Sequence, residues 1–224
     1  MKTLLSRQAT PMRKLACLAF VVFLSGCAGD SDVARVGKFL IGTLNGSGEK
    51  IPRERVAAVP YASMGLALGS NPEVLLVLGT TVADEQDWFA GESIFLATRQ
   101  GRIIRTAGLP YDLGGIRSIS NNSGGMGAMG PVFQTIDFPD LGIFGAPLKC
   151  SSQVMGDESV EILGASIPAR HIVEHCEVAA LRWTFDNHFW EDPATGTVWR
   201  SSQYVHPKSP PVILEVLRPA QQAG

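Results

Sequence analysis

Two histidines and a glutamate, at His171, Glu174 and His175, have the H-x-x-E-H spacing of a zinc-protease signature. In a helix this spacing would bring both imidazoles to one metal ion. Pro168 and the β-branched residues after it favour a strand instead, in which residues four apart lie roughly 13 Å from each other. A shared zinc ion would need both nitrogens at about 2.1 Å. We therefore expect no metal and no other cofactor.

Three acidic residues, Asp186, Glu191 and Asp192, could supply the carboxylate pair that glycoside hydrolysis requires. Glu191 and Asp192 adjoin an expected turn, where carboxylates commonly bond to their own backbone. The chain has no G-x-S-x-G serine motif. Its glycine-rich stretch from Ser118 to Gly130 lacks the Gly-Lys-Ser/Thr end of a phosphate-binding loop and is expected to be a surface loop. We assign no catalytic residue and expect a protein that is not an enzyme.

A tryptophan-rich hairpin from Arg182 to Val205 could bind a ligand through one of its faces. Alternation on its first strand separates an expected core set of Trp183, Phe185 and Phe189 from an outward set. On the return strand Trp199 and Gln203 share one face and the outward residues share the other. Aromatic rings beside planar hydrogen-bonding groups suit sugars. The candidate surface for a glycan or a partner protein comprises Trp190, Asp186, His188, Arg200 and Ser202. The alternative is a tryptophan-rich core with a paired arginine.

The amino terminus predicts a lipoprotein signal peptide over residues 1–26. Four basic residues precede a ten-residue apolar run, Leu15–Leu24. As a helix this run would rise only about 15 Å, half of a bilayer core, so it is a signal-peptide core and not a membrane span. The run ends in Leu24-Ser25-Gly26-Cys27, which resembles a lipobox with Cys27 as the lipidated residue. Either Met1 or Met12 could be the start of this signal.

Cleavage before Cys27 would change the charge and the cysteine count of the chain. The mature protein keeps 198 residues, with 15 basic and 21 acidic side chains and a net charge of −6. This charge argues against binding to nucleic acid or to anionic lipid. Cys17 would leave with the signal, so Cys150 and Cys176 remain, either as a disulfide or as two separate buried thiols.

The mature chain is expected to hold a short tether at residues 27–30 and one β-rich domain at residues 31–224. A helix carrying Val33, Val36, Leu40 and Leu44 should begin the domain. Short β-rich segments with turn residues between them then predict a mainly β fold: an antiparallel meander, curved sheet or half-open barrel. The expected strands are Val74–Leu78, Ser93–Thr98, Arg102–Ala107, Val132–Phe138, Glu158–Leu163, Ala169–Val178, Arg182–Trp190, Thr197–Val205 and Val212–Leu217.

Three groups of motifs, spread over residues 51–218, resemble the YjbF/GfcB family of lipoproteins, which is tied to group 4 capsule and related exopolysaccharide secretion. The resemblance implies a β-rich fold and an accessory role in exopolysaccharide export, and it brings no catalytic residues. The motifs are Ile51-Pro52-Arg53 with Pro60-Tyr61-Ala62-Ser63-Met64; Gly101-Arg102 with Arg105-Thr106-Ala107-Gly108-Leu109-Pro110; and Asn187, Trp190-Glu191-Asp192, Thr195-Gly196 and Trp199-Arg200-Ser201-Ser202-Gln203.

Together these features predict an outer-membrane lipoprotein that faces the periplasm and acts as a non-enzymatic accessory or scaffold in capsule assembly or export. Ala28 follows the lipidated cysteine where an inner-membrane retention signal would have Asp. The expected partners are the membrane, through the lipid, other export proteins, and the polysaccharide. The alternatives are a periplasmic polysaccharide-modifying enzyme and a carrier that holds a lipid-linked glycan in an apolar cavity.

Overall fold

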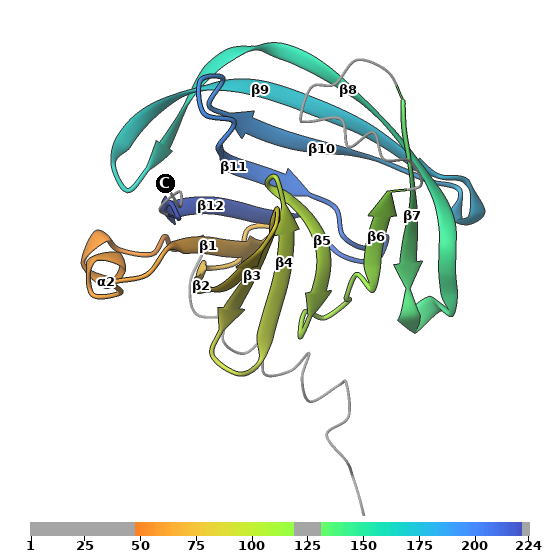
Figure 1. Ribbon diagram of the computed structural model, residues 1–224, viewed down its shortest axis with the longest axis horizontal. Helices are drawn as coiled ribbons and strands as arrows, with labels where there is room; N and C mark the ends of the chain where they lie inside the picture. Colours follow the sequence, from red (N-terminus) through yellow and green to blue (C-terminus); the bar gives the residue numbers. More distant parts are fainter. Residues whose placement is uncertain (1–47, 119–130, 221–224) are drawn as a thin grey trace, which may run out of the picture.

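The computed structural model describes residues 48–118 and 131–220, which form a nearly closed β-sheet (Figure 1). The expected helix over residues 33–44, Cys27 and most of the glycine-rich stretch lie outside these residues. No helix in the described ranges is long and apolar enough to cross a membrane. The elements are α2 (Arg53–Ala57), β1 (Ser63–Leu68), β2 (Val74–Val82), β3 (Glu85–Ala90), β4 (Ile94–Arg99), β5 (Arg102–Ala107), β6 (Gly115–Ser118), β7 (Val132–Phe138), β8 (Ile143–Ile162), β9 (Ala165–Val178), β10 (Trp183–Glu191), β11 (Val198–Gln203) and β12 (Val212–Arg218).

Twelve antiparallel strands of the described chain make one sheet in the order β5-β4-β3-β2-β1-β12-β11-β10-β9-β8-β7-β6. Strands that are consecutive in the sequence pair with each other from β1 to β5 and from β6 to β12. The β1–β12 pair joins the two ends of the domain. The edge strands β5 and β6 approach each other, and the Thr106 N–H donates across this seam to the Leu113 carbonyl at 3.0 Å. The prediction of a mainly β, antiparallel, curved or half-open barrel is therefore confirmed.

Several expected strand boundaries differ from the observed ones; for example, Glu158–Leu163 is only the end of β8, and β2 continues to Val82. Two of the boundaries are wrong because the chain turns there. Leu163 and Arg182 have φ values of 50° and 49°, in the left-handed region that a strand cannot use. Between the expected strands Ser93–Thr98 and Arg102–Ala107 the chain turns at Gln100 and Gly101, with φ values of 50° and 78°. A Cβ at Gly101 would lie 2.6 Å from the Cβ of Val198, so only glycine lets this turn touch β11.

Apolar side chains on the inward faces of the strands form the core that the sheet encloses. Leu66, Leu76, Leu96 and Phe138 are fully buried in this core. Burial of each such side chain from water contributes roughly 1.5–3 kcal/mol. Gln203 also points inward, where its amide accepts a bond from the Ile103 N–H at 2.9 Å and donates to the Gly101 carbonyl at 2.9 Å. This glutamine ties the β4–β5 turn to β11.

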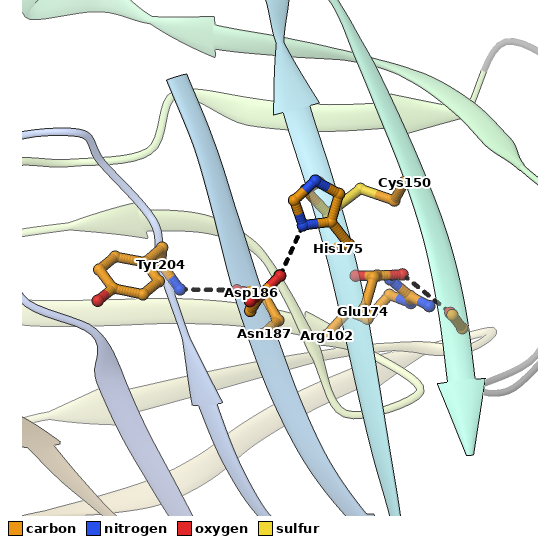
Figure 2. The surroundings of a disulfide bond; sticks show 9 residues. Arg102, Cys150, Glu174, His175, Asp186, Asn187 and Tyr204 are labelled. Carbon is orange, nitrogen blue, oxygen red and sulfur yellow. Dashed lines mark hydrogen bonds and ion pairs between the residues drawn. A yellow bond between two sulfur atoms is a disulfide. The ribbon is translucent and has the colours of Figure 1, made fainter. Parts of the chain in front are cut away.

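Of the two possible states of the remaining cysteines, the structure contains the disulfide (Figure 2). Cys150 on β8 lies directly opposite Cys176 on β9, and both are buried. Closing a loop of 26 residues stabilises a fold by about 3.5 kcal/mol in the chain-entropy account. Beside it, buried Glu174 forms an ion pair with Arg102 of β5. The disulfide therefore joins β8 to β9, and the ion pair joins β9 to the edge strand β5.

Candidate functional site

The five residues of the candidate surface lie on one outward face of β10 and β11. Trp190 pairs with Arg200, and His188 pairs with Ser202 across the two strands. Asp186 is exposed, and the other four side chains are partly exposed. The geometry of the sheet therefore brings these five residues together.

The opposite face of β10 points into the core, but one of the three residues expected there, Trp183, is not fully buried. Phe189 is fully buried and Phe185 is nearly so, as expected. Trp183 is only half-buried, because it lies at the start of the strand, where it stacks on Phe185 with a centroid distance of 4.0 Å. Trp183 is thus a flank of the core and not its centre.

Residues of β8 and β9 extend the outward face beyond the hairpin. The Trp190 indole N–H donates to Glu158 Oε2 at 2.9 Å, and His171 Nδ1 lies 2.9 Å from Glu158 Oε1. The His171 and Trp190 rings stack with centroids 4.7 Å apart and planes 6° apart. His188 Nδ1 lies 3.0 Å from His171 Nε2. Alternation of residue types within the hairpin could not reveal these partners, because they come from other strands.

The row continues across β11 and β12 through charged side chains. Arg200 lies 5.9 Å from the centre of the Trp190 ring and 2.5 Å from Glu215 Oε1. Lys50 bridges Glu215 and Glu73 at 2.6 and 2.7 Å. Both carboxylates are almost inaccessible to solvent, and each has a cationic partner. We call this row the outer ladder: Glu158, His171, Trp190, Arg200, Glu215, Lys50 and Glu73.

Two residues of the outer ladder lie beside the Trp190 ring. His171 belongs to β9 and Arg200 to β11, so they flank Trp190 from opposite sides. His171 stacks on one face of the indole, and the Arg200 guanidinium lies 5.9 Å from the ring centre. The surface can therefore offer hydrogen bonds and charge around a partly exposed aromatic ring.

Hydrogen bonding and burial determine the protonation states of Glu158 and His188 on this face. The Trp190 N–H bond is the largest of the influences that hold the pKa of Glu158 below its usual value, so the carboxylate stays ionised. Burial, followed by the neighbouring His171, lowers the pKa of His188. His188 is accordingly neutral at neutral pH, so one of its ring nitrogens donates a hydrogen bond and the other accepts one.

The residues of the zinc-protease spacing lie on a strand and do not converge. His175 bonds to Asp186 at 2.7 Å, whereas His171 bonds to Glu158 and His188 (Figure 2 shows the first pair). Glu174 points to the other side of the sheet. Among the described residues, the group of three potential ligands that does lie together is Cys150, Glu174 and Cys176, and its two sulfurs form the disulfide.

One of the two acidic residues beside the β10–β11 turn, Asp192, forms hydrogen bonds within that turn. Asp192 accepts bonds from the Ala194 N–H and the Thr195 hydroxyl, each at 2.8 Å. The Ala194 bond is the main reason that the pKa of Asp192 is lowered, whereas burial raises the pKa of Glu191. Both oxygens of Asp192 are thus bonded within the turn.

A cavity of about 650 Å³ opens at the end of the sheet where the β2–β3, β4–β5 and β10–β11 turns meet. Residues from all three sequence motif groups line it, among them Met64, Gly101, Gly196 and Ser201. We call it the end cavity. The sequence did not single it out, because its lining comes from turns far apart along the chain.

Another polar cluster that the sequence did not reveal surrounds His206, which is fully buried. Its Nε2 lies 3.1 Å from Asp140 Oδ1, and its Nδ1 accepts the Lys208 N–H at 3.1 Å. The ring stacks on Tyr111 with centroids 5.0 Å apart. Because a backbone N–H can only donate, Nδ1 must be unprotonated, and the neutral ring satisfies both bonds.

This geometry predicts that the fold loses stability in mild acid. Burial is the main cause that lowers the pKa of His206, and it acts likewise on His188. The unfolded chain therefore binds these protons more tightly, so the stabilisation is complete above the usual histidine pKa and falls as pH drops through the lowered value. Urea unfolding at pH 7.5 and pH 5 should show the decrease, and His206→Phe should show a smaller one. An unchanged pH dependence in His206→Phe would contradict this assignment.

Comparison with known proteins gives the chain its relatives. The family described as group 4 capsule polysaccharide lipoprotein gfcB, YjbF matches residues 40–217. Uncharacterized lipoprotein GfcB of Escherichia coli K12 is 25% identical over 222 residues, which cover 93% of this chain and 100% of GfcB. Uncharacterized lipoprotein YjbF of the same organism is 23% identical over 222 residues, which cover 94% of this chain and 100% of YjbF.

A solved structure shares the fold. The crystal structure of the hypothetical lipoprotein YmcC from Escherichia coli K12 superposes with a TM-score of 0.62 at 26% identity. The match covers 73% of this chain and 89% of that one. The family match contains every described strand except the last residue of β12. The chain belongs to the YjbF family of group 4 capsule polysaccharide lipoproteins.

Proposed function

We propose that this lipoprotein is a non-enzymatic accessory protein in the assembly or export of a capsule-type exopolysaccharide. Lipid on Cys27 would tether it to the outer membrane, with its domain in the periplasm. Its outward face around Trp190, His188 and Ser202 would dock the polysaccharide or another export protein. One observation supports the proposal: the five adjacent strands β8 to β12 carry a polar row of side chains on their outward side, linked by hydrogen bonds and ion pairs.

The chemistry of the described residues supports a binding role over catalysis. Two carboxylates of the candidate surface and the outer ladder are held by partners: Glu158 by Trp190 and His171, and Asp186 by His175. Asp192 is committed to its turn. General acid–base hydrolysis would need two carboxylates facing a shared substrate space. A rigid network that fixes side-chain positions instead suits repeated docking, because little conformational entropy is lost on binding.

The docking face can be blocked without breaking the outer ladder. Ser202→Lys and Asp186→Lys each place a long cation on the proposed surface, and neither residue belongs to the ladder. We expect each variant to lower exported polysaccharide about tenfold, equivalent to about 1.4 kcal/mol of lost docking. Immunoblots of membrane fractions should show unchanged protein levels.

Thr184→Lys provides the matched control for this experiment. Thr184 is exposed on the outward side of the same strand, opposite Glu177 and near the far end of β10. A lysine there adds the same charge and bulk away from His188 and Ser202, and should leave export unchanged. If Ser202→Lys and Asp186→Lys export as much polysaccharide as Thr184→Lys, the docking face has been misassigned.

A further inference from the structure

The end cavity is separate from the docking face, since its lining points inward while Trp190 and Ser202 point outward. Its floor is made by strands β1, β3, β4, β11 and β12, and its rim by three hairpin turns. Its volume of about 650 Å³ lies within the range of about 300–1,000 Å³ that small-molecule sites occupy.

The lining combines apolar and polar groups but carries no charge. Within the described residues, no ionisable side chain lines the cavity. Its apolar surface includes Met64, Trp88 and Leu214. Its polar groups are hydroxyls and amides, from Thr81, Gln86, Thr98, Gln100, Thr197 and Ser201.

Several of these polar groups have bonding capacity left over. The buried Thr98 hydroxyl accepts the Trp88 indole N–H at 3.0 Å, and the buried Ser201 hydroxyl accepts an amide N–H of Gln203 at 2.8 Å. Each hydroxyl can therefore still donate its own proton. At the rim, the side chains of Gln86 and Gln100 make no hydrogen bond within the described ranges, so their amides can both donate and accept.

We propose that the end cavity binds an uncharged, hydroxyl-rich ligand, namely a short neutral stretch of a glycan. Hydroxyls can pair with the spare donors and acceptors, while the carbon skeleton of a sugar ring packs on the apolar walls. A uronate or phosphate group would lose its hydration with no cation to replace it. A lipid chain would leave the buried Thr98 and Ser201 protons unpaired.

Ligand-detected NMR titration of the purified chain tests this proposal. The neutral probes are cellotriose, maltotriose and chitotriose, the anionic probe is trigalacturonate, and the alkyl probe is 1-decanol. We expect a neutral trisaccharide to bind with a Kd of about 1 mM or tighter. Gln86→Leu, which removes an amide and keeps the bulk, should weaken binding about tenfold. Thr81→Trp, which obstructs the rim, should abolish it.

Two controls separate this site from the docking face. Thr184→Trp, at an exposed outward position, should leave trisaccharide binding unchanged, and so should Ser202→Lys. Tighter binding of trigalacturonate or 1-decanol than of every neutral probe would overturn the proposal. So would the absence of binding by all three neutral trisaccharides, or neutral binding that survives Thr81→Trp. Export failure in Ser202→Lys with normal sugar binding would leave both proposals standing.

Discussion

Replacing Cys27 with alanine should abolish lipidation of the protein completely, and with it the lipid anchor. The thiol of Cys27 is the acyl acceptor of the expected lipobox, and alanine offers no atom for that bond. Each buried methylene of an acyl chain contributes about 0.8 kcal/mol, so several chains hold a protein almost permanently, whereas the net charge of −6 gives no electrostatic attachment. Fractionation followed by mass spectrometry of the amino-terminal peptide should find a soluble or unprocessed form with no added lipid.

A serine replacement at Cys17 is the matched control for the anchor. Cys17 lies within the apolar signal core and is expected to leave with it, so Cys17→Ser should not alter the mature, lipidated peptide. Membrane association that is unchanged in Cys27→Ala, with the same lipidated mass, would show that the lipid is elsewhere. Export should also fail in Cys27→Ala, because an untethered domain has no fixed position relative to the membrane.

Much of the fold could be predicted from local patterns. Val132–Phe138 is β7 as expected, and β5 matches Arg102–Ala107 to the residue. These strands have β-branched and aromatic residues next to clear turn residues, and such signals are local. The positive φ values at Gln100 and Gly101 likewise follow from a two-residue turn.

Other strands could not be predicted because tertiary contacts decide them. Strand β1 is buried on both faces, so it shows no alternation; its outer side is covered at Gly65, where a Cβ would lie 3.1 Å from Glu73 Oε2. Strand β3 begins with polar residues that disfavour a strand, yet it pairs with β2 and β4 on both edges. The first half of β8 contains Gly145 and Pro147, which ordinarily indicate turns.

For the candidate surface too, local sequence patterns predicted which residues face outward, but not which residues from other strands contact them. Period-two alternation was enough to place Trp190 and His188 on the face opposite Phe189. It could not show that His171 stacks on Trp190 and that Arg200 lies beside it, because these contacts depend on the register of β9 and β11. Nor could it show Lys50 bridging to Glu215, which is 165 residues away.

Phe189→Ala and Trp190→Ala should differ sharply, although the two residues are adjacent. Phe189 is fully buried, so truncation leaves a cavity and costs about 3–5 kcal/mol, lowering Tm by about 6–20 °C in a domain of this size. Trp190 is partly exposed and loses one hydrogen bond, to Glu158, together with its ring contacts. Its removal should cost about 1 kcal/mol, with a correspondingly small change in Tm.

The most direct test of the docking face is the amount of exported polysaccharide per folded, membrane-anchored protein in cells carrying Trp190→Ala. Thermal melting of the same variant, beside Phe189→Ala, measures how much of the protein is folded. We expect Trp190→Ala to lower export about tenfold, the effect of roughly 1.4 kcal/mol of lost docking, while its Tm stays within a few degrees of the wild type. Normal export by Trp190→Ala, or a Tm as low as that of Phe189→Ala, would contradict the account and make this face a structural part of the sheet.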